Sequence, residues 1–140
     1  MEIDDRIEKF VRRHHVLTLA TSTAEGKPYC CNVFYAYAGA GRFIFTSDAQ
    51  TRHAGMMAQN AHVAASVVLE TRVVGKVQGL QITGRAVRTG DEADRRTYIK
   101  RFPYAALADI TLWRLEARML KYTDNTLGFG KKLLWQREEE

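Results

Sequence analysis

A ten-residue stretch, 45–54, holds the residue types best suited to binding a phosphate group. It reads Phe-Thr-Ser-Asp-Ala-Gln-Thr-Arg-His-Ala, in which a strand end is followed by hydroxyl and basic side chains where a helix begins. A helix start offers unpaired backbone N–H groups, and a nearby hydroxyl and guanidinium complete a phosphate cradle. Arg52 is the strongest candidate. The alternative is that Thr51 or Asp48 only caps the helix and Arg52 is a surface charge; composition alone favours this alternative.

Other chemistry-bearing side chains form no recognisable set. The histidines lack metal-ligand spacing, so no metal site is expected, and no Ser-His-acid set can be assembled. The only cysteines, Cys30 and Cys31, are adjacent in a predicted strand and so point to opposite faces, as two free thiols in a reducing cytoplasm. The catalytic residues remain unknown, which agrees with a function in which a bound cofactor supplies the redox chemistry.

The elements that position these residues follow from hydrophobic periodicity. Period-2 alternation and turn residues predict strands over 16–22, 28–37, 42–46, 62–69, 73–87, 110–123 and 133–135. Helical spacing and acidic first turns predict helices over 3–14, within 48–60, and from 91 until Pro103 stops the last one. This order favours antiparallel pairing with a few covering helices, a mainly β fold of the β-barrel type.

Two details of this pattern concern the barrel wall. In the strand over 110–123, alternation places Trp113, Leu115, Ala117 and Met119 on one face. In the strand over 73–87, three glycines suggest bulges or bends: Gly75, Gly79 and Gly84. Phe43, Phe45 and Trp113 are expected in the core.

Composition limits the function classes. With 140 residues, 46% hydrophobic and 26% charged, the chain is expected to form one domain over 1–140. No apolar run is long enough to span a membrane and the acidic start lacks a signal-peptide pattern, so a cytoplasmic protein is expected. The net charge of +5 comes from scattered basic residues, which favours a small anionic ligand over nucleic acid or an acidic membrane surface.

The stretch over 45–54 resembles the phosphate-binding turn of pyridoxamine-phosphate-oxidase-like FMN proteins. The resemblance extends over most of the chain, through the strand that begins at Pro28 and the Gly-Arg-Ala that follows Thr83. Within that superfamily the chain is similar to a small uncharacterised bacterial family. The shared stretches are Asn32-Val33-Phe34-Tyr35, Thr51-Arg52-His53-Ala54, Arg101-Phe102-Pro103 and the segment 122–132, Tyr-Thr-Asp-Asn-Thr-Leu-Gly-Phe-Gly-Lys-Lys. The resemblance implies an antiparallel split β-barrel that binds FMN.

Carried over residue by residue, the resemblance implies that Thr51 and Arg52 hold the FMN phosphate, with Thr46 or Ser47 nearby. His53 stands where the oxidases have a lysine. The backbone of Cys31, Asn32 and Val33 would follow the isoalloxazine edge, and Gln81, or less so Gln78, would lie near the ribityl chain or ring.

The resemblance also implies a homodimer with the flavin between two subunits. The residues that would reach the partner's site are Asn125, Gly128, Phe129, Lys131 and Trp135; for Phe129 and Trp135, core or dimer packing is an equal alternative. The implied function is an FMN-dependent oxidoreductase or flavin-reductase-like enzyme of unknown substrate. The alternative is a flavin-binding module without turnover, and nucleic-acid binding is the least favoured function.

Overall fold

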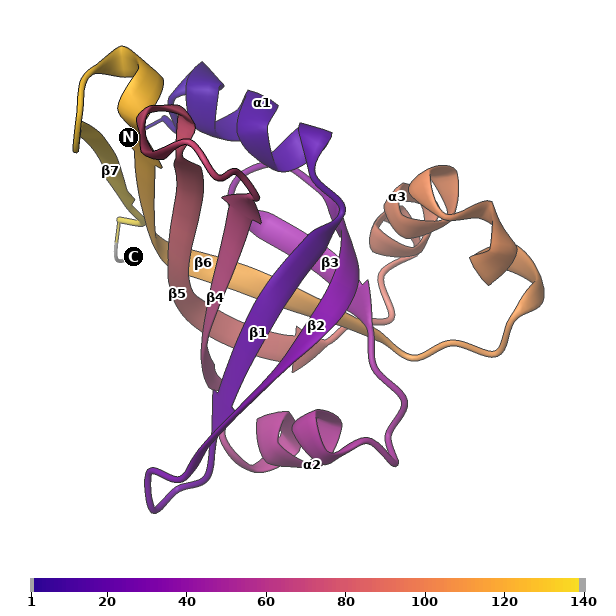
Figure 1. Ribbon diagram of the computed structural model, residues 1–140. Helices are drawn as coiled ribbons and strands as arrows, with labels where there is room; N and C mark the ends of the chain where they lie inside the picture. Colours follow the sequence, from indigo (N-terminus) through magenta and orange to yellow (C-terminus); the bar gives the residue numbers. More distant parts are fainter. Residues whose placement is uncertain (1, 139–140) are drawn as a thin grey trace.

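The computed structural model describes residues 2–138. Seven strands form one antiparallel sheet in the order β3-β2-β1-β4-β5-β6-β7, and pairing of β3 with β6 closes the first six into a barrel (Figure 1). The strands are β1 Val16–Ser22, β2 Pro28–Tyr37, β3 Arg42–Thr46, β4 His62–Leu69, β5 Gln78–Arg88, β6 Leu112–Asp124 and β7 Lys132–Gln136. The predicted antiparallel split-barrel fold with helices is confirmed.

Three α-helices cover the barrel: α1 Asp5–Arg13, α2 Arg52–Gln59 and α3 Glu92–Arg101. Figure 1 shows α1 across one end of the barrel, α2 across the other, and α3 standing to the side of β2 and β3. Short 3-10 turns complete the chain as η1 Val74–Lys76, η2 Pro103–Leu107 and η3 Asn125–Leu127. No helix within residues 2–138 is long and apolar enough to cross a membrane.

The barrel interior is filled by the alternate residues that the sequence pattern marks as apolar. Fully buried side chains there include Leu17, Leu19, Phe43 and Phe45. The helices α1 and α2 close the two ends of the barrel and contribute Phe10 and Met57 to the same core. A second, smaller core lies between β3 and α3 and contains Ile44, Tyr98, Ala105 and Leu112. This second core fixes the segment 92–107, called here the α3–η2 arm, beside the barrel.

The prediction that Met119 shares one face of the strand with Trp113, Leu115 and Ala117 is wrong, because β6 contains a bulge. Thr83 pairs with Met119 but Gly84 pairs with Ala117, so Arg118 has no partner on β5. The extra residue shifts the alternation by one, and Leu120 points into the core instead. Of the three glycines expected to mark bulges, Gly84 is confirmed: a Cβ there would lie 2.9 Å from the Ala117 Cα.

Two strand starts also differ from the prediction. Residues 73–77 do not extend β5, since Val74–Lys76 forms η1 and the strand begins at Gln78. Likewise β6 begins at Leu112 and not at Ile110. In both places β-branched residues favour a strand locally, but they precede the point where a partner strand is available for pairing.

Candidate functional site

The turn between β3 and α2 is built by hydrogen bonds of its own side chains. Thr51 is the N-cap of α2, where its Oγ1 accepts from the Ala54 amide at 3.2 Å and donates to the Asp48 carbonyl at 2.8 Å. Ser47 is buried, and its Oγ is hydrogen-bonded to Nε2 of His53. Burial lowers the pKa of His53, so its imidazole is mainly neutral at neutral pH.

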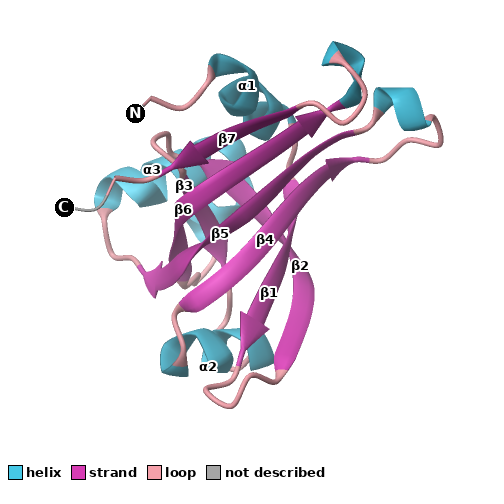
Figure 2. Cartoon of the chain, turned by 90° about the vertical axis from the view of Figure 1, so that its left-hand side faces the viewer, coloured by secondary structure: helices cyan, strands magenta, loops and turns pink. Residues whose placement is uncertain are grey.

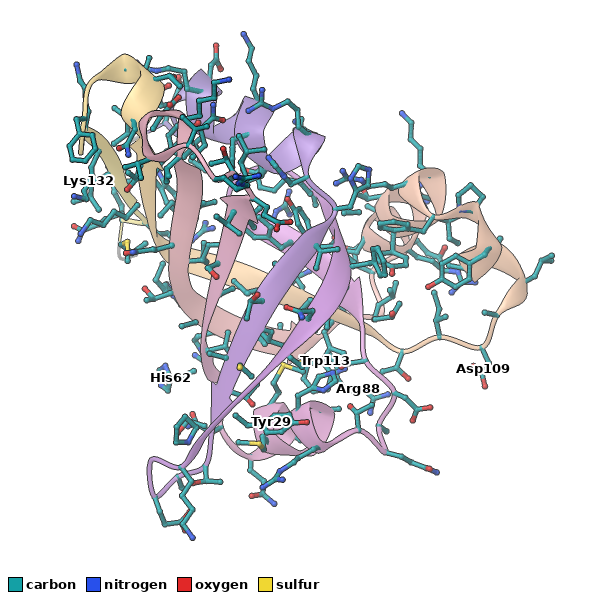
Figure 3. All side chains as sticks on the ribbon, in the orientation of Figure 1. Tyr29, His62, Arg88, Asp109, Trp113 and Lys132 are labelled. Carbon is teal, nitrogen blue, oxygen red and sulfur yellow. The ribbon has the colours of Figure 1, made fainter. Side chains whose placement is uncertain are left out.

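Arg52 is the exposed cation of this turn. Its guanidinium carbon lies 4.9 Å from the centre of the Tyr29 ring at the start of β2, a cation–π contact that holds the side chain beside the strand. Figure 3 shows Tyr29 directly above α2. The first amides of α2, those of Arg52 and His53, have no hydrogen-bond partner within residues 2–138, as expected at a helix start. The turn therefore offers an anion two amides and a guanidinium.

The barrel is split next to this turn, along β2. Residues Pro28–Phe34 pair with β1, but β3 pairs with β2 only over Tyr35–Tyr37. The Tyr35 amide donates to the His15 carbonyl on the β1 side at 2.9 Å. Because backbone groups alternate sides in an antiparallel ladder, Cys30 and Asn32 turn theirs the other way, where no strand is paired. We call this stretch, residues 28–33, the open edge of β2.

This alternation changes the roles expected for two residues of the strand. The backbone groups of Cys31 and Val33 face β1 and are used in the ladder, and the Val33 side chain is buried in the core. Of the three expected ring-edge residues, only Asn32 turns its backbone to the open edge. Cys30, which is not among the residues expected from the resemblance, does the same, and only the strand register identifies it.

The structure does not bring Gln81, Asn125 and Lys131 to this turn within one chain. Gln81 is exposed on β5, three strands away from Asn32 through the cross-strand neighbours Thr18 and Ser66. Asn125 and Lys131 lie in the loop before β7, and Figure 3 shows the neighbouring Lys132 on the opposite side of the molecule from Tyr29. Gln78 is also remote, with its Oε1 2.9 Å from Arg13 Nη2.

The loop before β7 is held by its own polar side chains. Asn125 Nδ2 donates to the Val74 carbonyl at 2.8 Å, and its Oδ1 accepts from the Gly130 amide at 3.0 Å. Asn125 therefore has a structural role in the single chain. Phe129, between two glycines with positive φ, is 81% exposed, which excludes core packing for it, whereas Trp135 belongs to the core.

Part of the outer face of the sheet beside the open edge, over residues 16–20, 30–34, 64–68 and 81–83, carries no charged side chain, and the outward-facing Arg85 on β5 and Lys121 on β6 border it. Its outward residues are Val16, Thr18, Ala20, Cys30, Asn32, Phe34, Ala64, Ser66, Val68, Gln81 and Thr83. Figure 2 shows the strands β1, β4 and β5 that form this face with no helix over them. We call this set of residues the uncharged face. Because 26% of the chain is charged, the absence of charge here is a local depletion, which is typical of the centre of a protein–protein interface.

The family model described as pyridoxamine 5'-phosphate oxidase matches residues 3–123. A UPF0306 protein of Photorhabdus laumondii is 38% identical over 135 residues, which cover 94% of each chain. The chain belongs to the UPF0306 family. This family lies within the pyridoxamine 5'-phosphate oxidase-like superfamily, as predicted from the stretches over 45–54 and 122–132.

Two solved structures share the fold of this UPF0306 protein. A FAD-binding protein from Mesorhizobium loti has a TM-score of 0.71 at 17% identity and covers 84% of this chain and 90% of its own. A heme-binding protein from Mycobacterium smegmatis has a TM-score of 0.72 at 20% identity over 87% of this chain. The match covers 52% of that heme-binding chain, so the UPF0306 protein spans about half its length.

The donor set of the turn fits a flavin phosphate in part. Two free amides and Arg52 provide positive charge, and the open edge provides both donors and acceptors for a ring edge. Thr51 and His53 are already engaged, with the helix cap and Ser47 respectively. No group of three or more His, Cys, Asp or Glu side chains in the described part of the chain is placed to hold a metal ion.

Proposed function

We propose that this UPF0306 protein binds FMN along the open edge of β2 and acts as a flavin-dependent oxidoreductase on a small molecule. The single observation that carries the proposal is the unpaired stretch of β2 next to the start of α2, linked by the Arg52–Tyr29 contact. The phosphate would lie at the α2 end and the isoalloxazine ring toward Asn32. Bound FMN would supply the redox centre, and the protein would supply binding and orientation.

At the phosphate end, Arg52 and the amides of Arg52 and His53 would carry the binding. Ser47 and Thr51 would support the site without contacting the phosphate: Thr51 fixes the helix start, and Ser47 holds His53 in place. Thr46 precedes them as the last residue of β3. A neutral His53 adds no charge to the site, so most of the electrostatic attraction would come from Arg52. The negative charge of Asp48 opposes this attraction. Its Oδ1 accepts a hydrogen bond from the Gln50 amide at 2.9 Å, which offsets part of that charge.

At the ring end, the free N–H and C=O groups of Cys30 and Asn32 suit the edge of an isoalloxazine, which alternates hydrogen-bond donors and acceptors. Backbone groups on a strand are fixed in place and therefore cost little to order on binding. The FAD-binding and heme-binding relatives with this fold support a planar cofactor in general terms. Flavin is favoured here because the one histidine of the turn, His53, is engaged with Ser47.

We further propose that two copies pack through the uncharged face, in the cytoplasm, with the flavin between them. Asn125, Phe129, Lys131 and Gln81 lie far from the turn in one chain, and a second copy is the route by which they could approach a flavin. An 81% exposed Phe129 followed by Lys131 suits contact with a planar anion.

The test is a titration of the purified protein with FMN, followed by flavin fluorescence, with riboflavin as the ligand that lacks phosphate. We expect one FMN per chain, much weaker riboflavin binding, and a large loss of FMN affinity in Arg52→Ala. Arg72→Ala, which removes an exposed arginine from the loop after β4, is the matched control. Undiminished FMN affinity in Arg52→Ala would refute the site. FMN binding without turnover of NAD(P)H across a panel of acceptors would leave a flavin-binding module.

A further inference from the structure

The hydroxyl group of Tyr98 lies in the small core between β3 and the α3–η2 arm and has no hydrogen-bond partner within residues 2–138. The side chain is fully buried, with 0% of its surface exposed. A hydroxyl taken out of water without a hydrogen bond opposes folding, and such groups are rare in native proteins. A phenylalanine would fill the same place without that cost, so the hydroxyl has a use other than folding.

Two further hydroxyl groups lie next to that of Tyr98. Burial raises the pKa of Tyr98 to about 12, and the hydroxyls of Thr46 on β3 and Tyr104 on η2 are close enough to act on it as well. Neither forms a hydrogen bond of normal geometry with the Tyr98 hydroxyl. Thr46 is half-buried and Tyr104 is 62% exposed, so the group opens to solvent at Tyr104. We call Thr46, Tyr98 and Tyr104 the hydroxyl cluster.

Strand alternation explains why Thr46 faces this cluster. Phe43 and Phe45 point into the barrel, so Ile44 and Thr46 turn toward the arm. The pairing of β3 with β2 ends at Phe45, opposite Tyr35, and Thr46 is the first residue beyond the closed part of the barrel. The hydroxyl cluster therefore lies at the split. None of its three residues belongs to the uncharged face, and packing of two copies through that face does not use them.

The charged side chains on the same face of α3 are already paired. Asp94, one turn before Tyr98, accepts hydrogen bonds from Thr89 and Arg114, each at 2.8 Å. Arg101, one turn after Tyr98, donates to three backbone carbonyl groups. This helix face therefore offers no free charge to a ligand. A charged ligand would lose its hydration here without gaining a counter-ion, so an uncharged ligand is favoured.

An oxygen atom that accepts hydrogen bonds from both Tyr98 and Thr46 suits this arrangement. A carbonyl oxygen has two lone pairs and no charge, so it can accept both bonds. The ring of Phe102 lies 5.0 Å from that of Tyr98, centre to centre, and adds aromatic surface beside the hydroxyls. The exposed side chain of Tyr104 can change rotamer without disturbing the core and so admit a ligand.

We propose that the hydroxyl cluster binds the oxygen of an uncharged aromatic carbonyl compound, such as an aryl ketone or a quinone. Tyr98 and Thr46 are the hydrogen-bond donors, and Tyr104 is a movable cover. Binding of the carbonyl compound does not require FMN. Because the cluster lies at the split, such a compound is also a candidate substrate of the oxidoreductase, and that use alone rests on the proposed function.

The test is a titration of the full chain with acetophenone, an aryl ketone that does not react with the exposed Cys30, followed by saturation-transfer NMR. Isopropenylbenzene, in which a CH₂ group replaces the oxygen, is the control ligand. We expect saturable binding of acetophenone and weaker binding of isopropenylbenzene. Acetophenone affinity should fall roughly two- to tenfold in Tyr98→Phe and in Thr46→Val, the range for loss of one hydrogen bond.

Tyr35→Phe is the matched control variant. Tyr35 is as fully buried as Tyr98, but its hydroxyl donates to the Val11 carbonyl at 2.6 Å. We expect Tyr35→Phe to keep the affinity for acetophenone and to unfold at a lower urea concentration than wild type. Tyr98→Phe should unfold at the wild-type concentration or above it, because the change removes a buried hydroxyl that has no partner.

Absence of saturable acetophenone binding, equal affinities of wild type and Tyr98→Phe, or a loss of stability in Tyr98→Phe as large as that in Tyr35→Phe would overturn the proposal. Acetophenone binding through Tyr98 in a chain that does not bind FMN would refute the proposed function and leave this site standing. Binding of FMN without binding of acetophenone would refute this site alone.

Discussion

The Arg52 guanidinium lies over the ring of Tyr29, with 4.9 Å between the guanidinium carbon and the ring centre. This contact joins the start of α2 to the start of β2, the two elements that border the split in the barrel. A free arginine side chain loses rotamer entropy when it binds an anion. Because the Tyr29 ring already restricts the Arg52 side chain, less entropy is lost on binding.

Tyr29→Leu should therefore weaken FMN binding by a modest factor. An exposed cation–π contact contributes about 0.5–1 kcal/mol, which corresponds to roughly two- to fivefold in affinity. The loss should vanish in an Arg52→Ala background, because the ring then has no cation to hold. A double-mutant cycle measured by FMN titration checks this, with riboflavin as the control ligand. Equal losses in both backgrounds would mean that Tyr29 acts independently of Arg52.

Gly84→Ala should strongly destabilise the fold. A Cβ at this position would collide with the backbone of Glu116 and Ala117 on the paired strand, and backbone atoms cannot move aside as a flexible side chain can. We expect a loss of about 1–3 kcal/mol or more in the free energy of unfolding, measured in urea. Gly75→Ala is the control, because its added Cβ meets no atom within 4 Å. Similar urea midpoints for the two variants would contradict the tight approach at the bulge.

Arg101→Gln should loosen the α3–η2 arm. The change removes donors from the carbonyl groups of Arg12, His14 and Tyr35; the bonds to His14 and Tyr35 are part-buried, and each hydrogen bond lost there should cost about 0.5–1.5 kcal/mol. Hydrogen exchange should show faster opening of the end of α1 and of α3, together with a lower melting temperature. Arg96→Gln, at an exposed position of the same helix, should have little effect on either measurement.

Stability should fall as the pH drops below neutrality, and His53 should contribute to this fall. Its folded-state pKa lies below the ordinary value of 6.5 because burial disfavours the imidazolium. Folding therefore favours the neutral form; the contribution is complete above about pH 6.5 and is lost as the pH falls toward the lowered pKa. Urea unfolding at pH 7.5 and pH 5.5 should show a smaller difference for His53→Gln than for wild type. His62→Gln, at an exposed position, should keep the wild-type difference.

The sequence by itself determined the elements and the family. Alternation along Val16–Ser22, helical spacing through Ile7, Phe10 and Val11, and the cap at Thr51 depend on neighbours within a few residues. Such local patterns can be detected without knowing the pairing of strands. The position of Arg52 at a helix start was accessible in the same way.

Only the tertiary structure decided which groups of these elements are free to bind. The bulge at Arg118 turned Met119 outward, and the register of β2 against β1 left the backbone of Cys30 and Asn32 open while using that of Cys31 and Val33. The side chain of Asn125 is hydrogen-bonded to the Val74 carbonyl, and that of His53 to Ser47. Hydrophobic periodicity does not predict either contact. The bulge and the open edge depend on strand pairing between distant residues, and a shift of one residue in that pairing exchanges the two faces of a strand.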